Sequence, residues 1–165
     1  DTSRKTHKMV GDRKIRSMQL HGQSNVPESP TTLKAKIKNH LSEIDGFNQR
    51  YWEFAEALGV RPAVSQSLIL AFDELLSNII YYAYRDDNEH EIEIQVDLTE
   101  TAVTTTIMDD GVAFNPFGLD EPDTTTSLQS REIGGLGIHL VRQIIDQVSY
   151  EHRDGKNIVT LIQHR

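Results

Sequence analysis

A glutamate and an asparagine one helical turn apart are the first residues whose types and spacing suggest chemistry. Glu74 and Asn78 belong to the otherwise mostly apolar run Glu74-Leu75-Leu76-Ser77-Asn78. Residues four apart leave the same face of a helix, so the carboxylate and the amide should lie side by side. Polar groups among apolar neighbours need partners, and the oxygens of phosphates and metal-bound water are suitable ones. Taken alone, the pair is equally consistent with a solvated helix surface.

An acidic turn follows a β-branched segment and forms a second candidate. It reads Asp109-Asp110-Gly111-Val112-Ala113-Phe114. A carboxylate at a strand end can accept a hydrogen bond from an exocyclic amine, and a glycine beside it lets a flat ring come close. Without further context, an ordinary acidic turn explains these six residues better.

A glycine-rich turn before an expected helix is the third candidate. The run is Gly134-Gly135-Leu136-Gly137. Free N–H groups and the positive end of the helix dipole make such a terminus an anion site. The run is neither a P-loop nor a dinucleotide fingerprint, because the residues that define those motifs are missing. Glycine-rich caps also occur where no ligand binds.

Hydrophobic periodicity and turn residues predict the elements that must position these segments. Strands are expected at 15–21, 91–98, 102–108, 148–152 and 158–163, helices at 33–58, 62–84 and 138–147, and an irregular stretch at 109–133. Asp154-Gly155 should close the last hairpin. This order predicts an α+β two-layer sandwich, a mixed β-sheet with helices on one face.

The order and spacing of the three segments carry more information than each segment does. A helical E-x-x-x-N, a D-x-G-x-A-F after a strand, and G-G-L-G-I at a helix start resemble the N, G1 and G2 boxes of the GHKL ATPase superfamily, which has the Bergerat ATP-binding fold. The forms FDELLSN with YAY, DDGVAFNP and GGLGIHLV most resemble the anti-sigma-factor serine kinases. The resemblance covers about residues 15–165.

The resemblance implies ATP and Mg²⁺ as ligands and gives the segments roles. It implies that Asn78 ligates Mg²⁺, that Glu74 is the general base, and that Asp109 holds the adenine amino group with Gly111 beside the ring. The backbone N–H groups that should bind phosphate are those of Gly135, Leu136, Gly137 and Ile138.

The same resemblance makes the stretch from Phe117 to Ile133 an ATP lid. The chain departs from the family pattern in two places. Ala113 stands where glycine is common, and Arg131 lies slightly earlier than the lid arginine of related kinases, which leaves its reach to the γ-phosphate open.

The activity implied is a serine/threonine-protein kinase that phosphorylates an anti-anti-sigma protein of the STAS class. A sigma factor would be a second partner, sequestered in an alternative state, and a homodimer is compatible with the family. A non-catalytic ATP-binding regulatory module is the alternative, although Glu74 argues against it because a pure binder needs no base. A histidine-kinase catalytic domain would need a dimerising helical hairpin, and His40 lacks that setting.

Composition sets the remaining expectations. The 165 residues correspond to one domain and carry a net charge of −8, which disfavours direct binding to nucleic acid. The absence of cysteine and of an apolar run of about 18 residues favours a cytoplasmic protein with no membrane association. Residues 1–14 are expected to be a basic, disordered leader to a kinase domain at 15–165.

Overall fold

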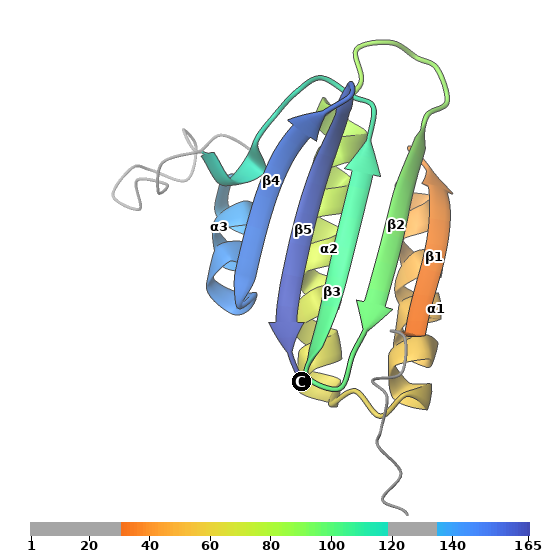
Figure 1. The fold of residues 1–165 in the computed structure, drawn as a ribbon. Coiled ribbons are helices and arrows are strands. Elements are labelled where there is room, and N and C mark those ends of the chain that lie inside the picture. The colour runs from red at the N-terminus through yellow and green to blue at the C-terminus, as the bar shows by residue number, and fades with distance from the viewer. Residues whose placement is uncertain (1–30, 119–134) are drawn as a thin grey trace, which may run out of the picture.

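The structure is a computed structural model that describes residues 31–118 and 135–165 (Figure 1). Its elements in chain order are β1 (Thr31–Lys38), α1 (Ser42–Ala57), α2 (Pro62–Tyr82), β2 (Glu91–Leu98), β3 (Ala102–Asp109), the short 3-10 helix η1 (Pro116–Gly118), α3 (Gly135–Ile144), β4 (Gln147–Arg153) and β5 (Lys156–His164). The predicted α+β class with three main helices is confirmed.

The five described strands form one sheet in the order β1-β2-β3-β5-β4. All four pairings are antiparallel, so the expectation of a mixed sheet is wrong. After the α3 crossover, β4 runs in the same direction as β3. However, β5 pairs with both and lies between them. The α1–α2 pair similarly returns the chain to the end where β1 finished, so β2 runs back along β1.

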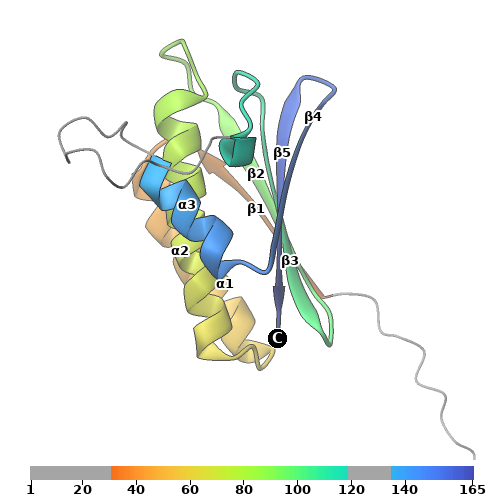
Figure 2. The ribbon, with the colours of Figure 1, turned by 90° about the vertical axis from the view of Figure 1, so that its left-hand side faces the viewer.

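The three α-helices cover one face of the sheet and leave the other face open (Figure 2). Strand alternation explains this arrangement. In β2, Ile92, Ile94, Val96 and Leu98 are buried, whereas the intervening residues are exposed or half-buried. The helices complete the core with an aromatic cluster in which the Phe72 ring lies edge-on to the rings of Phe47 and Tyr51, at centroid distances of 5.2 and 5.1 Å.

Helix α2 is the central element of the helical layer. By length and composition it is the one described helix apolar enough to cross a membrane. Leu68, Phe72 and Leu76 of this helix have no exposed surface. These side chains are part of the core between the helical layer and the sheet. Packing within the domain therefore explains the apolar residues on the inward face of α2.

The first predicted helix is wrong over its N-terminal part. Instead of a helix from Leu33 to Leu58, the chain forms β1 and then α1. Leu33, Ile37 and Leu41 are spaced by four, which fits one helix face and also fits alternate positions of a strand. Pairing with β2 decides between them by burying Ala35 and Ile37 and turning the lysines outward.

The other predicted elements agree with the structure to within a few residues. Helix α1 continues through Gly46 without a break, and α3 begins at Gly135 rather than at Ile138. The β4–β5 hairpin turns at Asp154 and Gly155, whose φ angles of 54° and 73° are those of a type I′ turn. The strand predicted at 15–21 and the leader at 1–14 lie outside the described residues.

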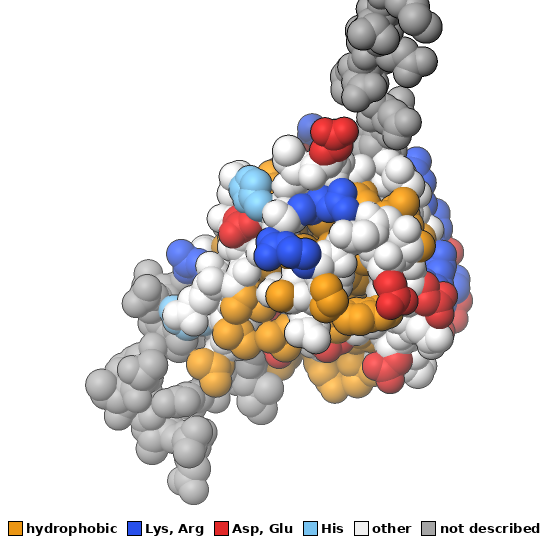
Figure 3. Space-filling model, turned by 90° about the horizontal axis from the view of Figure 1, so that it is seen from below, with side chains coloured by type: hydrophobic (Ala, Val, Ile, Leu, Met, Phe, Trp, Pro, Cys, Tyr) orange, Lys and Arg blue, Asp and Glu red, His pale blue; other side chains and the backbone are white. Residues whose placement is uncertain are grey.

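The C-terminal residue ties the lower end of the domain together. Arg165 donates from its guanidinium to the carbonyl oxygens of Leu58 at 2.7 Å and Thr99 at 3.1 Å. These contacts join β5 to the end of α1 and to the β2–β3 turn. Seen from this end, basic side chains lie beside hydrophobic ones on the surface (Figure 3).

Candidate functional site

The predicted polar pair is present on α2. Glu74 and Asn78 are half-buried, whereas Leu75 and Leu76 between them are in the core. The Asn78 Nδ2 atom donates to the Glu74 carbonyl oxygen at 2.8 Å. This bond leaves the Oδ1 atom of Asn78 directed away from that carbonyl and able to bind another group.

Glu74 lies directly against the first turn of α3. A Cβ atom placed on Gly137 would overlap the Oε2 and Cδ atoms of Glu74. Gly137 is therefore required by the carboxylate that packs on it, a reason the sequence alone did not indicate. This contact joins the first and third predicted segments, 63 residues apart in the sequence, numbered 74 and 137.

The predicted phosphate-binding residues are the first turn of α3. Gly135, Leu136, Gly137 and Ile138 are its first four residues, and the N–H groups of such positions have no partner within their helix. Ile138 is buried and anchors this turn in the core, whereas Leu136 is exposed. Gly134 and Arg131 lie outside the described residues, so the structure does not place that arginine.

Asp109, the carboxylate predicted to hold the adenine amino group, is the last residue of β3. Asp109 is 5% exposed, and its Oδ1 atom accepts from the Gly111 N–H at 2.8 Å and from the Asn157 Nδ2 at 2.8 Å. Burial raises the pKa of the Asp109 carboxyl above its ordinary value, while these two hydrogen bonds act in the opposite direction.

The turn after Asp109 docks on the C-terminal end of α2. A Cβ atom on Gly111 would lie 2.7 Å from the Ala83 carbonyl oxygen, so no side chain fits there. The N–H of Val112 donates to the same oxygen at 2.8 Å. Gly111 thus has a packing role in addition to the predicted place beside a ring, and Ala113 is exposed on the same turn.

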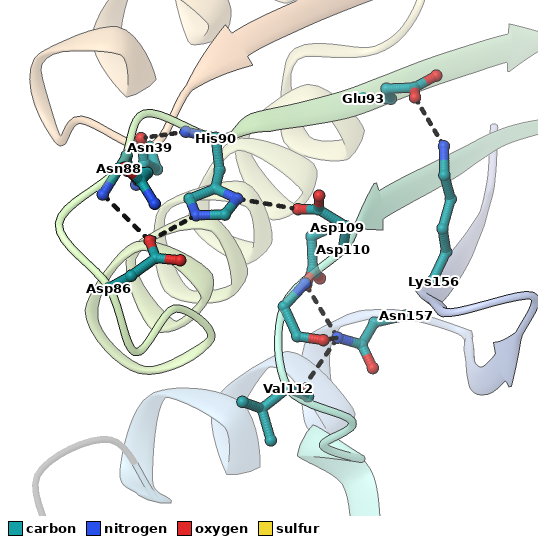
Figure 4. A network of polar contacts seen from close by, with 11 residues as sticks. Asn39, Asp86, Asn88, His90, Glu93, Asp109, Asp110, Val112, Lys156 and Asn157 are labelled. Carbon is teal, nitrogen blue, oxygen red and sulfur yellow. Dashed lines mark hydrogen bonds and ion pairs between the residues drawn. The ribbon is translucent and has the colours of Figure 1, made fainter.

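A buried asparagine that the sequence reading missed completes this turn. Asn157 is 4% exposed at the start of β5 and donates to Asp109 and to the Val112 carbonyl oxygen, the latter at 3.1 Å (Figure 4). The signal available in the sequence was the alternation of inward and outward residues along the strand. Asn157 shares the inward face of β5 with Val159 and Leu161, where a polar residue is unusual.

A cluster of side chains around His90 borders the same turn from the β2 side (Figure 4). The two ring nitrogens of His90 contact Asp86 at 2.8 Å and Asp110 at 3.3 Å, and the ring stacks on Tyr84 at 4.1 Å. The hydrogen bond to Asp86 raises the pKa of His90, and the charges of Asp86 and Asp110 act in the same direction. None of these contacts was predicted.

Two groups of residues therefore lie along α2. Glu74 and Gly137 form one, and Asp109 with its turn joins the helix at Ala83. Positions 74 and 83 are nine steps apart along the chain, which corresponds to about 13 Å of helix. Asn78 lies between them on α2.

The donor set around Asn78 fits Mg²⁺ held through phosphates. Among residues 31–118 and 135–165, no three His, Asp or Glu side chains gather as a metal cage. Magnesium on phosphate needs only one or two protein ligands and keeps several waters. The Oδ1 atom of Asn78 is available for such a role because its Nδ2 is already engaged.

The sequence matches a known domain family over most of its length. The model of the histidine kinase-like ATPase domain matches residues 37–163. The serine/threonine-protein kinase BtrW of Bordetella bronchiseptica is 34% identical over 98 residues, or 59% of this chain and 69% of that protein. The serine-protein kinase RsbW of Bacillus subtilis is 24% identical over 98 residues, 56% of this chain and 61% of its own length.

A solved structure has the same fold. The RsbU and RsbW domains of a Mycobacterium tuberculosis protein align with a TM-score of 0.58 at 13% identity, over 82% of this chain and 33% of that one. At this identity the likeness concerns the fold alone. Together with the family match, it supports the predicted GHKL architecture. The chain belongs to the family of histidine kinase-like ATPase domains and is homologous to the BtrW and RsbW serine kinases.

Proposed function

We propose that this domain is a serine/threonine-protein kinase that transfers the γ-phosphoryl group of ATP to an anti-anti-sigma protein of the STAS class. The observation that carries the proposal is the packing of Glu74 on Gly137. It puts a half-buried carboxylate against a helix N-terminus suited to phosphate. The names of the BtrW and RsbW relatives support a protein kinase activity.

The nucleotide is proposed to lie along α2, with its base at Asp109 and its phosphates at α3. Asp109 would accept a hydrogen bond from the adenine amino group, with Gly111 and Ala113 in the adjoining turn. The N–H groups of residues 135–138 would bind phosphate oxygens. Arg131, which lies outside the described residues, is proposed as a further nucleotide-binding residue.

The Oδ1 atom of Asn78 would hold Mg²⁺, which when bound neutralises phosphate charge and orients the phosphates. The role of Glu74 is to orient the attacking hydroxyl and accept its proton. The hydroxyl oxygen bonds to the γ-phosphorus as the bond from that phosphorus to the β,γ-bridging oxygen breaks, and ADP leaves. Phosphoryl transfer asks the protein mainly for positioning and charge stabilisation, so one base and an anion site are sufficient.

The partners are proposed from the same family relationship. The STAS protein would be the substrate, and a sigma factor would be bound in the alternative state, which makes the domain an anti-sigma factor in the cytoplasm. A homodimer is proposed as the assembly. The alternative function, a non-catalytic ATP-binding module, would keep the nucleotide site without transferring phosphate.

Transfer of label from γ-labelled ATP to purified STAS-domain proteins encoded near this gene tests the proposal. We expect one of them to be labelled on serine or threonine in a Mg²⁺-dependent manner, and not by the Glu74→Gln variant. Nucleotide binding by calorimetry should be measured on the same samples. ATP binding without labelling of any candidate would favour the regulatory module.

A further inference from the structure

Asn157 occupies a position where a polar side chain is costly. It is 4% exposed, on the inward face of β5 in line with Val159 and Leu161. A buried amide without partners destabilises a fold, so the hydrogen bonds of Asn157 indicate its role.

The amide nitrogen of Asn157 points to the turn that follows β3. Nδ2 lies 2.8 Å from the Asp109 Oδ1, 3.1 Å from the Val112 carbonyl oxygen and 3.3 Å from the Gly111 carbonyl oxygen. All three atoms are acceptors, so only the NH₂ end of the amide can face them. The orientation of this side chain is therefore determined by its surroundings.

The amide oxygen is held from the other side. It accepts from the Tyr150 hydroxyl at 2.8 Å, and the Phe114 N–H donates to it at 3.4 Å. The Nδ1 atom of His152 lies 3.3 Å away. These contacts come from β4 and from the turn itself, so rotation of the amide would break bonds on both sides.

Both donors to Asp109 converge on one of its two oxygens. The Gly111 N–H and the Asn157 amide each bond to Oδ1. Within the described part of the chain, no residue donates to Oδ2. Because a carboxylate is planar, fixing Oδ1 from two directions also fixes where Oδ2 points.

We propose that Asn157 is a positioning residue that holds the Asp109 carboxylate with Oδ2 presented to the amino group of the nucleotide base. This inference rests on the proposed function, since it assumes that Asp109 reads adenine. It assigns to β5 a part in base selection that no motif of the sequence indicated. Asn157 acts through Asp109 and through the turn, without touching the base.

Replacement by threonine or valine separates the hydrogen bond from the shape of the side chain. The two residues have nearly the same volume and both suit a strand, but only threonine can donate to Asp109. We expect Asn157→Thr to retain ATP affinity within about threefold and Asn157→Val to weaken it about tenfold, the usual effect of losing a hydrogen bond to a charged group. Thermal melts should show that both variants are folded.

A cycle with Asp109→Asn tests whether Asn157 acts through Asp109. In that background the difference between the threonine and valine variants should shrink to less than about twofold, because the charged acceptor is gone. An unchanged difference would show that Asn157 acts elsewhere and would overturn the inference. Equal ATP affinities of folded Asn157→Thr and Asn157→Val would do the same.

A measurement without nucleotide separates this inference from the proposed function. The pKa of Asp109, followed by NMR of its carboxyl carbon, should be higher in Asn157→Val than in Asn157→Thr, because the hydrogen bond favours the ionised form. Equal values would refute the positioning role even in a protein that binds ATP. Absence of ATP binding with the expected difference in pKa would instead refute the nucleotide assignment.

Discussion

The two ends of the candidate site are built in different ways. At Asp109 the described residues form a network in which β3, β5 and the following turn fix one carboxylate oxygen by two hydrogen bonds of 2.8 Å. At Glu74, by contrast, no described residue makes a hydrogen bond or ion pair with the carboxylate, which is placed by the packing of α2 against α3 at Gly137. The first carboxylate is held by hydrogen bonds, whereas the second is held in place by packing alone.

The largest effect should come from Glu74→Gln, which keeps size but removes the basic oxygen. We expect phosphoryl transfer to fall roughly 10²–10⁴-fold while ATP affinity stays within a few-fold. Asp73→Asn is a matched control because the neighbouring Asp73 bonds to Asn48 on α1 at 2.6 Å. Phosphoryl transfer by Glu74→Gln at the wild-type rate would show that Glu74 is not the general base.

Gly137→Ala tests whether packing alone places that carboxylate. The added methyl group must displace Glu74, and misplacement by about 1 Å can cost on the order of 10²-fold in rate. Gly46→Ala in α1 has open space around it and should leave the rate unchanged. The rate of single-turnover phosphoryl transfer should be measured for both variants. Equal rates for Gly137→Ala and Gly46→Ala would mean that the position of Glu74 is not critical.

Asp109→Asn should affect recognition more than chemistry. Losing a hydrogen bond from a charged group costs roughly 1.5–3 kcal/mol, so ATP affinity should fall by about tenfold or more. Guanine presents a carbonyl oxygen to the carboxylate, and the wild type should therefore prefer ATP to GTP. Calorimetry that gives equal affinities for the two nucleotides would contradict the assignment of Asp109.

Gly111→Ala should destabilise the domain through the docking of the turn. Its Cβ atom would meet the backbone of Ala83, and overpacking of this kind costs about 1–3 kcal/mol. The free energy of unfolding in denaturant measures the effect, with Gly46→Ala as the control for a methyl group in open space. A variant as stable as the wild type would show that the turn can move away from α2.

The smallest effect should be the pH dependence set by His90. Its pKa is raised in the folded state by the hydrogen bond to Asp86. The stabilisation is therefore complete below the unfolded value of about 6.5 and is lost as the pH rises through the raised value. NMR titration of the His90 ring should show the higher pKa, and the Asp86→Asn variant should lower it.

Much of the fold was predictable because the signals were local. The charged–apolar alternation of Glu91–Leu98 predicted β2, and Asp154-Gly155 predicted the last hairpin. Leu33 and Ile37 were misread because a spacing of four suits both a helix and a strand. Pairing of Ala35 with Ile94, 59 positions later by their numbers, decided the matter. No window of a few residues contains that information.

By itself, the sequence determined the family, the α+β class and the three segments that carry the candidate site, because these depend on residue types and short spacings. Only the tertiary structure decided which groups meet. Packing of α2 on α3 set Glu74 against Gly137, and sheet pairing of β3 with β5 brought Asn157 to Asp109, 48 residues away. Such contacts depend on how separate elements are registered against one another, and residue spacing along the chain does not specify that register.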